Sequence, residues 1–240
     1  RSTLFPYTTL FRSRTGTLEI DLRTRGVDHP QYIRHLHRLA ILTYDKGDAP
    51  AAEKLYRQSI ELHRRILGPE HPETIDAMSS IGLFLMETDR PDEAQTILQA
   101  VLDINRRLRP KHAYVGNDLE NLGRLAFKRQ HYVEAEKRFD AALAIYHDAL
   151  PACHGLIAAT QTMRGHAQLA QGRTTDAQKT LQIAMDCWRI EYGPNSPGYA
   201  MARASLGRTW ALQGKFSDAE TALIESYPII VKSKIGRAHV

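Results

Sequence analysis

Small and large apolar residues recur along this chain in a fixed order, with repeat intervals of 42, 41, 42 and 42 residues. The intervals separate four histidines and a serine, and other positions keep the same register. Self-similarity with such a period is the sequence signature of a solenoid. The columns are His29, His71, His112, His154 and Ser196; Ala40, Gly82, Gly123, Gly165 and Gly207; Ala52, Ala94, Ala135, Ala177 and Ala219; Tyr56, Leu98, Phe139, Leu181 and Leu223; and Ile60, Leu102, Leu143, Met185 and Tyr227.

Within one unit the apolar spacing is helical. Val115, Leu119, Leu122 and Ala126 are three or four residues apart, and a second run with the same steps begins at Ala135. Such steps place apolar side chains on one stripe of an α-helix. Stretches rich in Gly, Pro and polar residues separate the two runs in each unit. The pattern therefore predicts an all-α fold of helical hairpins, helix A followed by helix B, in which the small column lets the backbones approach and the large column fills the space between them.

The connector LGPEHPET, residues 67–74, predicts how one hairpin ends and the next begins. Gly68 is placed to end helix B in the left-handed conformation that only glycine adopts cheaply. Pro72 suits the first turn of the next helix A, because an N–H at that position would have no acceptor within the helix. The preceding His71 then falls at the N-cap, where the fifth unit has Ser196, a strong capping residue.

Capping is the role we expect for the whole histidine column, and no metal site. Histidines in equivalent connectors are one repeat apart, on the order of 10 Å by helix-packing distances. Zinc, in contrast, needs ligand nitrogens at about 2 Å.

The two ends differ from the rest of the chain. Residues 1–13 (RSTLFPYTTLFRS) and 235–240 (IGRAHV) resemble translated sequencing adapter, so we treat them as non-native. We expect residues 14–28 to be helix B of a truncated repeat, and five repeats to follow in a gene fragment open at both ends. The expected repeats are 29–70, 71–111, 112–153, 154–195 and 196–234.

Charge argues against nucleic acid as a partner. The chain has 32 Lys and Arg against 27 Asp and Glu, but Arg1, Arg12 and Arg237 lie in the adapter-like ends, which leaves 29 against 27 and a net charge of +2. The remaining charges are mixed, whereas nucleic-acid binders concentrate Lys and Arg on a face or tract. No segment approaches the roughly 18 consecutive apolar residues of a membrane span. We therefore expect no nucleic acid, no membrane, no cofactor and no small-molecule substrate.

The two cysteines, Cys153 and Cys187, are too few for a disulfide framework. Cys187 falls in an apolar column, so we expect a buried, inert thiol and, with it, a reducing cytoplasmic location. Cys153 and His154 are adjacent and do not form a productive dyad. No catalytic constellation or kinase motif is visible within residues 14–234, so we expect this segment not to be an enzyme. The column of Cys187 also holds Leu62, Ile104, Ile145 and Ile229.

The repeated columns resemble the tetratricopeptide repeat. The period of 42 residues and the LGPEHP connector are similar to the kinesin-light-chain type of that family. The resemblance implies a right-handed superhelix of antiparallel helix pairs, with helix A lining a concave groove that holds a partner peptide or helix. The phrase ALIESYPII, residues 222–230, resembles the closing repeat of arrays that follow bacterial serine/threonine kinase domains. Two functions therefore stay open: a protein-binding scaffold, which we favour, or the regulatory or docking array of a larger bacterial signalling protein.

The family resemblance also implies which helix A residues line the groove. They combine apolar anchors with polar side chains, and suggest a partner segment of alternating hydrophobic and acidic character. Met86 and Phe127 could equally fill the core between repeats, and self-association through the cut repeat ends is possible. The groove residues are Arg34, His37, Ile41, Tyr44, Asp76, Ser79, Leu83, Met86, Asn117, Glu120, Arg124, Phe127, His166 and Arg208.

Two departures from the pattern predict local weaknesses. Gln161 and Arg164 stand in the fourth unit where the third has Leu119 and Leu122, so this joint should be the softest in the array. Pro228 falls inside the last helix B and should stop or kink it.

Overall fold

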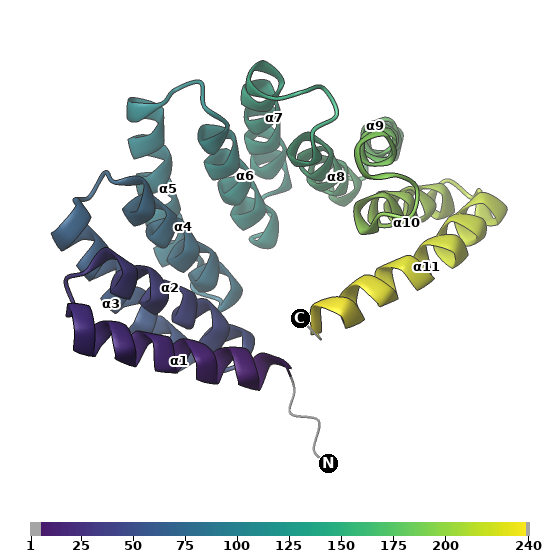
Figure 1. Ribbon diagram of the computed structural model, residues 1–240. Coiled ribbons are helices and arrows are strands. Elements are labelled where there is room, and N and C mark those ends of the chain that lie inside the picture. The colour runs from purple at the N-terminus through teal and green to yellow at the C-terminus, as the bar shows by residue number, and fades with distance from the viewer. Residues whose placement is uncertain (1–5, 239–240) are drawn as a thin grey trace, which may run out of the picture. The chain divides into compact units, whose positions relative to one another are not determined.

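The computed structural model describes residues 6–238, and the side chains of residues 16–233. Every regular element in this part of the chain is an α-helix, which confirms the all-α expectation (Figure 1). Residues 1–5 and 239–240, within the adapter-like ends, lie outside it. The helices are α1 (Pro6–Arg25), α2 (Pro30–Asp45), α3 (Ala49–Leu67), α4 (Pro72–Glu87), α5 (Pro91–Leu108), α6 (Ala113–Lys128), α7 (Tyr132–Ala149), α8 (Gly155–Ala170), α9 (Thr174–Tyr192), α10 (Pro197–Leu212) and α11 (Phe216–Ala238).

Short connectors join the helices into hairpins. The A helices are α2, α4, α6, α8 and α10, and the B helices are α3, α5, α7, α9 and α11. The chain divides into two compact units, which we call unit 1 (residues 6–104) and unit 2 (residues 105–238). Each unit is described by itself. None of the described helices is long and apolar enough to cross a membrane.

The small and large columns meet within the hairpins, as the sequence predicts. In unit 1 a Cβ added at Gly82 would lie 2.7 Å from Cδ2 of Leu98. In unit 2 the same happens at Gly165, where a Cβ would lie 2.6 Å from Cγ of Leu181. Real Cβ atoms do not approach this closely, so only glycine allows these large side chains to pack directly on the A helix backbone.

The histidine column caps the A helices, as predicted. Each histidine has an extended backbone, and its ring accepts a hydrogen bond from the N–H two residues later, one of the donors that a helix start leaves unpaired. In the fifth repeat the serine hydroxyl does the same one residue further on. The acceptors are Nδ1 of His29, His71, His112 and His154, at 3.2, 3.3, 3.2 and 3.2 Å, and Oγ of Ser196 at 3.3 Å.

Two B helices end at a glycine with positive φ. Gly68 has φ 93° and ψ 159°, and Gly193 has φ 82° and ψ 169°. The positive φ agrees with the sequence analysis. However, the ψ values differ from those of the left-handed helical conformation and correspond to the mirror image of an extended strand, which is equally accessible to glycine.

Pro228 does not stop the last helix, because α11 continues to Ala238. A proline removes one backbone hydrogen bond, to the carbonyl four residues earlier. That residue is Ile224, which is 63% exposed. Water can therefore hydrate the freed carbonyl, and the helix tolerates the proline.

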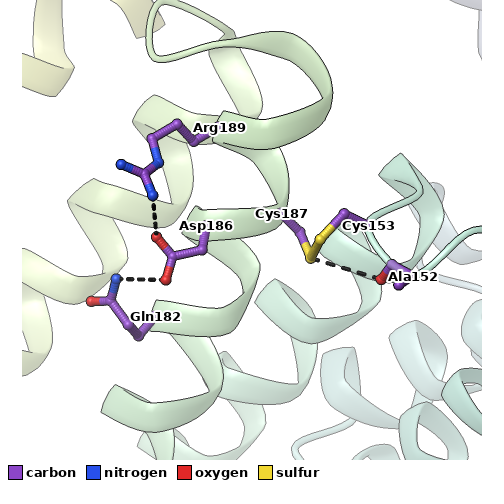
Figure 2. Close-up of a disulfide and its surroundings, with 6 residues drawn as sticks. All are labelled: Ala152, Cys153, Gln182, Asp186, Cys187 and Arg189. Atoms are coloured by element: carbon purple, nitrogen blue, oxygen red, sulfur yellow. Dashed lines mark hydrogen bonds and ion pairs between the residues drawn. A yellow bond between two sulfur atoms is a disulfide. The ribbon is translucent and has the colours of Figure 1, made fainter.

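Cys153 and Cys187 are joined by a disulfide (Figure 2). The expectation of a free, inert thiol at Cys187 is therefore wrong, although the residue is buried as predicted. Cys153 directly precedes the cap of α8, and packing of α8 against α9 brings the two Cα atoms to 4.6 Å despite 34 residues of separation. This contact depends on how far the start of α8 lies along the length of α9, and the column pattern does not encode that position. The disulfide also removes the cysteine-based argument for a reducing compartment.

The fourth repeat has polar side chains, Gln161 and Arg164, at two positions where the third repeat buries leucine. Gln161 is 7% exposed, and its Oε1 has no hydrogen-bond partner within the described chain. Arg164 reaches Asp140 of α7, with 2.7 Å between Nε and Oδ1. A buried acceptor without a partner costs about 1–3 kcal/mol, so Gln161 is a physical weakness in this repeat.

Candidate functional site

In unit 1, three of the groove residues surround a small cavity between α2 and α4. Arg34, His37 and Asp76 line it, and its volume is about 220 Å³. Three further lining residues, Arg38 from α2, His63 from α3 and Glu73 from α4, were not assigned to the groove from the sequence. His63 belongs to helix B, and only the packing of α3 beneath α2 brings its ring to this side. A cavity of this size has room for about one side chain of a partner.

His37 is held neutral in this cavity. Burial, followed by the charges of His63 and Arg38, lowers the pKa of His37 to about 4. The Ser80 hydroxyl donates to the Asp76 carbonyl, so it accepts from Nε2 of His37 at 3.2 Å. Nδ1 of His37 is then the unprotonated nitrogen, buried without a hydrogen-bond partner among the described residues. The cavity therefore contains an acceptor that a partner's donor could satisfy.

His63 presents a second neutral imidazole. It is 2% exposed, and burial is the main cause that lowers its pKa. Its Nδ1 donates to the carbonyl of Ser59 at 2.8 Å, which leaves Nε2 as an acceptor 3.9 Å from Oε2 of Glu73. Arg34 stands at the same carboxylate, with 3.7 Å between its Nε and Oε2. The cavity thus combines two neutral imidazoles with paired charges.

The apolar groove residues of unit 1 differ in exposure. Ile41 is 38% exposed and Leu83 is half-buried. The half-buried ring of Tyr44 packs edge-on against Phe84 of α4, with 5.1 Å between centroids. Met86 is 3% exposed, so its side chain belongs to the core beneath this surface. Ser79, the remaining position, donates to the carbonyl of Ile75 at 3.1 Å.

In unit 2, Asn117 and Glu120 of α6 join a buried hydrogen-bond cluster. The hydroxyl of Tyr146, from α7, donates to Oδ1 of Asn117 at 2.6 Å. Oγ1 of Thr160, from α8, lies 2.7 Å from Oε2 of Glu120. Burial raises the pKa of Glu120, and the hydrogen bond from Thr160 and the charge of Arg124 oppose that rise. The cluster fixes the polar surface where α6 meets α8.

Tyr146 and Thr160 were not assigned to the site from the sequence. Tyr146 falls on the apolar stripe of the helical run that begins at Ala135. A phenol in such a stripe needs a partner for its hydroxyl when buried, and this signal could have pointed to the polar residues of α6.

Arg124, His166 and Arg208 occupy the same column on α6, α8 and α10. Nε2 of His166 lies 2.7 Å from Oγ of Ser205, and burial, aided by the charge of Arg208, lowers the pKa of His166. His166 is therefore neutral at pH 7. Arg124 is half-buried and Arg208 exposed, and neither forms a direct ion pair within the part of the chain that the structure describes. Two cations consequently remain available on the A helices of unit 2.

Phe127, the remaining groove residue of unit 2, is partly exposed and partly packed against the core. Its half-buried ring lies 5.3 Å from that of Tyr132, measured between centroids, and packs against Ala126 and Phe139. Among the described residues, no group of three or more His, Cys, Asp or Glu side chains is arranged to hold a metal ion.

The capped, closely packed helical hairpins define a helical-repeat protein. Comparison of the sequence with known repeat patterns identifies the family. The pattern of the tetratricopeptide repeat matches residues 73–148 and 156–230, and a further form of that pattern matches residues 33–73. The matches extend over more than half of the chain. The chain belongs to the tetratricopeptide repeat family.

Two curated relatives share part of this array. The human tetratricopeptide repeat protein 19, mitochondrial, is 29% identical over 92 residues, which are 38% of this chain and 24% of the relative. The clustered mitochondria protein homolog of Ajellomyces capsulatus is 23% identical over 189 residues, 75% of this chain and 15% of the relative. The chain therefore spans a quarter or less of the length of these relatives.

Solved structures show the same fold. The putative kinesin light chain of Podosopora anserina, with nearly identical TPR-like repeats, has a TM-score of 0.69 at 22% identity, covering 85% of this chain and 98% of that one. BtubC (BKLC) from P. vanneervenii has a TM-score of 0.78 at 17% identity, covering 95% and 92%. The fold is thus a solenoid of antiparallel helix pairs, as in kinesin-light-chain-like arrays.

Proposed function

We propose that this chain is a non-catalytic scaffold that binds an acidic, partly apolar polypeptide segment on its A helices. Tetratricopeptide arrays are generally protein–protein interaction scaffolds, and both the family match and the fold support this class. No observation on the described residues favours the bacterial kinase alternative. That alternative and the cytoplasmic location stay predictions.

The observation that carries the proposal is the pair of free cations on unit 2. Arg124 is half-buried and forms no direct ion pair among the described residues, although its charge acts on Glu120 one turn earlier. Buried or half-buried charges in proteins are usually paired. A partner carboxylate would supply the missing charge at Arg124 and at Arg208. Apolar side chains of the same segment would cover the half-buried ring of Phe127.

The test uses a short dye-labelled peptide in which Glu alternates with Leu, and a twin with Lys in place of Glu. We expect the full chain to bind the Glu peptide and not the Lys peptide, with an affinity that falls as salt rises. The double variant Arg124→Glu/Arg208→Glu should weaken binding at least roughly tenfold, about 1.4 kcal/mol. Its helical circular dichroism should stay unchanged.

A matched control distinguishes the effect of these two arginines from the effect of the chain's net charge. Arg23→Glu/Arg106→Glu changes the charge by the same amount at two exposed arginines of α1 and α5. This control should bind the Glu peptide as the parent chain does. Equal binding by the Arg124/Arg208 variant and the parent would reject the A helices of unit 2 as the docking surface.

A further inference from the structure

A second hollow lies in unit 1, apart from the cavity between α2 and α4. It has a volume of about 590 Å³ and shares no lining residue with that cavity. Ile60 of α3 and Ile97 of α5 line its apolar part, above Met78 and Ile81 of α4. The hollow therefore opens between two B helices, whereas the proposed partner surface is formed by A helices.

The floor of this hollow is apolar and only partly covered. Met78 and Ile81 are 4% and 1% exposed, and Ile60 packs against the core that includes Met78 but remains half-buried. The residues at the same column position in the next two repeats, Leu102 and Leu143, are 0% and 5% exposed. Ile60 thus shows apolar surface that its counterparts in these two repeats bury, whereas Met185 is half-buried and Tyr227 is exposed. An apolar anchor would gain free energy by covering it.

The rim of the hollow is basic. Arg57, Arg64 and Arg65 line it together with one acid, Glu61, all from α3. These positions are separated by four, three and one residues, which places them on one face of the helix. The lining stretch runs from Arg57 to Arg65, roughly 12 Å along an α-helix.

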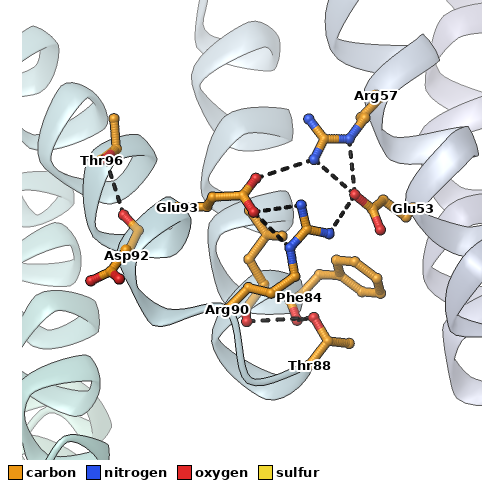
Figure 3. A network of polar contacts seen from close by, with 9 residues as sticks. Glu53, Arg57, Phe84, Thr88, Arg90, Asp92, Glu93 and Thr96 are labelled. Carbon is orange, nitrogen blue, oxygen red and sulfur yellow. Dashed lines mark hydrogen bonds and ion pairs between the residues drawn. The ribbon is translucent and has the colours of Figure 1, made fainter.

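One of the three arginines has its charge largely neutralised by a network at the start of α5 (Figure 3). Arg57 contacts Glu53 at 2.7 Å and Glu93 at 3.3 Å, and Arg90 contacts the same two carboxylates at 2.6 Å each. The network lowers the pKa of both glutamates, chiefly through Arg90. Arg57 is therefore held in place at one end of the rim.

Arg64 differs because it has no carboxylate partner within the described chain. Its Nη2 lies 3.5 Å from Sδ of Met78, so the guanidinium lies beside the apolar floor. Arg65 pairs with Asp28 from the connector before α2. The end of the rim opposite Arg57 thus carries a cation, Arg64, that has no carboxylate partner among the described residues and lies beside the apolar floor.

We propose that this hollow is a second docking site, for an acidic polypeptide segment that inserts a large apolar side chain between Ile60 and Ile97 and places a carboxylate on Arg64. Arg57 and Arg65 already have carboxylate partners, so the unpaired guanidinium of Arg64 is the group that makes an acidic occupant complementary. A rim of roughly 12 Å accommodates three or four extended residues at about 3.3 Å each, which favours a peptide over a single head group. The site goes beyond the A-helix function and stands independently of it.

The experiment uses the full chain and the same Glu–Leu peptide, together with a Gln–Leu twin. To remove the proposed A-helix contacts, binding is measured in the Arg124→Glu/Arg208→Glu background as well as in the parent. In the Arg124→Glu/Arg208→Glu background, Arg64→Glu should lower the remaining affinity at least roughly tenfold, and Arg64→Lys, which keeps the charge, should lower it less. In the parent, Arg64→Glu should remove one of two binding sites and so reduce the number of peptides bound per chain. Arg106→Glu, at an exposed arginine outside the hollow, is the matched control and should have no effect.

Each outcome bears on one site at a time. If Arg64→Glu binds like the parent while Arg124→Glu/Arg208→Glu does not bind, the hollow is not a docking site and the A-helix proposal stands. The reverse result supports the hollow and rejects the A helices. Equal affinity for the Glu and Gln peptides would overturn the acidic assignment. Displacement of the peptide by decanoate at matched concentration would instead mark the hollow as a site for free apolar carboxylates.

Discussion

Gly123 of α6 lies directly against the ring of Phe139 of α7: a Cβ at position 123 would stand 2.7 Å from Cε1 and 2.9 Å from Cδ1. Phe139 is completely buried. The contact repeats the relationship between Gly82 and Leu98 in the preceding hairpin. In the second, third and fourth repeats a single glycine of helix A thus lets the large side chain of helix B pack against the helix backbone.

We therefore expect Gly123→Ala to destabilise the chain. Alanine is favoured over glycine in a helix by about 1 kcal/mol, but here its methyl group must displace the ring, and overpacking costs about 1–3 kcal/mol. Urea unfolding of the full chain should show a net loss. Gly16→Ala is the control, because a Cβ at Gly16 would meet nothing within 4 Å. A gain in stability at both positions would contradict the close contact.

The histidine caps should be measurable one at a time. His112→Ala removes an acceptor from the first turn of α6, and we expect a loss of about 0.5–2 kcal/mol, as for other capping side chains. His112→Asp should keep most of the stability, since a carboxylate accepts the same bond. His131 is a matched control because it is the N-cap of α7 but makes no side-chain cap bond. Equal losses for His112→Ala and His131→Ala in thermal unfolding would argue against capping.

The weakness in the fourth repeat should be repairable. Gln161→Leu replaces a buried side chain whose Oε1 has no partner with the residue at the equivalent position of the third repeat. We expect a gain of about 1–2 kcal/mol in the free energy of unfolding. Gln168→Leu is the contrasting change: its Oε1 also has no partner among the described residues, but its Nε2 donates to Glu136 at 2.9 Å. It should destabilise, and a gain from both changes would show that only hydrophobicity matters.

Acidification should weaken unit 1 through His37. Its pKa is about 4 when folded, below the ordinary 6.5, so the unfolded chain takes up this proton at higher pH than the folded chain. Stability is then greatest above pH 6.5 and falls as the pH drops towards about 4. At 1.36 kcal/mol per pKa unit the loss at pH 4 is about 3 kcal/mol.

The control for this prediction is His37→Gln, which does not titrate. Free energies of urea unfolding of parent and variant, measured between pH 7 and pH 4, should converge or cross as the parent loses its advantage. Because other groups titrate in both chains, only the difference is interpreted. Parallel curves would mean that His37 is not neutralised by its surroundings.

Much of this architecture follows from the sequence because one pattern is used five times. The columns predict the hairpins, the close contact at Gly123 and the capping role of His112, since each depends on neighbours within one unit. Capping, for example, needs only a side-chain acceptor directly before a helix start, and this is visible in the chain itself.

The remaining features depend on packing between elements. The disulfide between Cys153 and Cys187 depends on the position of the start of α8 along α9. The hydrogen bond from Tyr146 to Asn117 depends on the rotation of α7 about its axis. Neither quantity is encoded in the spacing of apolar residues. The predicted stop at Pro228 is absent for a related reason, because the cost of the proline depends on whether water reaches the carbonyl of Ile224; the alternative, a kink, stays a prediction.

The disulfide also determines whether the two fragments separate after proteolytic cleavage between the cysteines. Cys153 and Cys187 close a covalent ring that contains the whole of α8 and the connector to α9. Arg173, an exposed trypsin site, lies in that connector. Cleavage there breaks the backbone, yet the amino-terminal and carboxyl-terminal fragments stay linked through sulfur. A nicked molecule would therefore migrate as one species without reductant and as two with it.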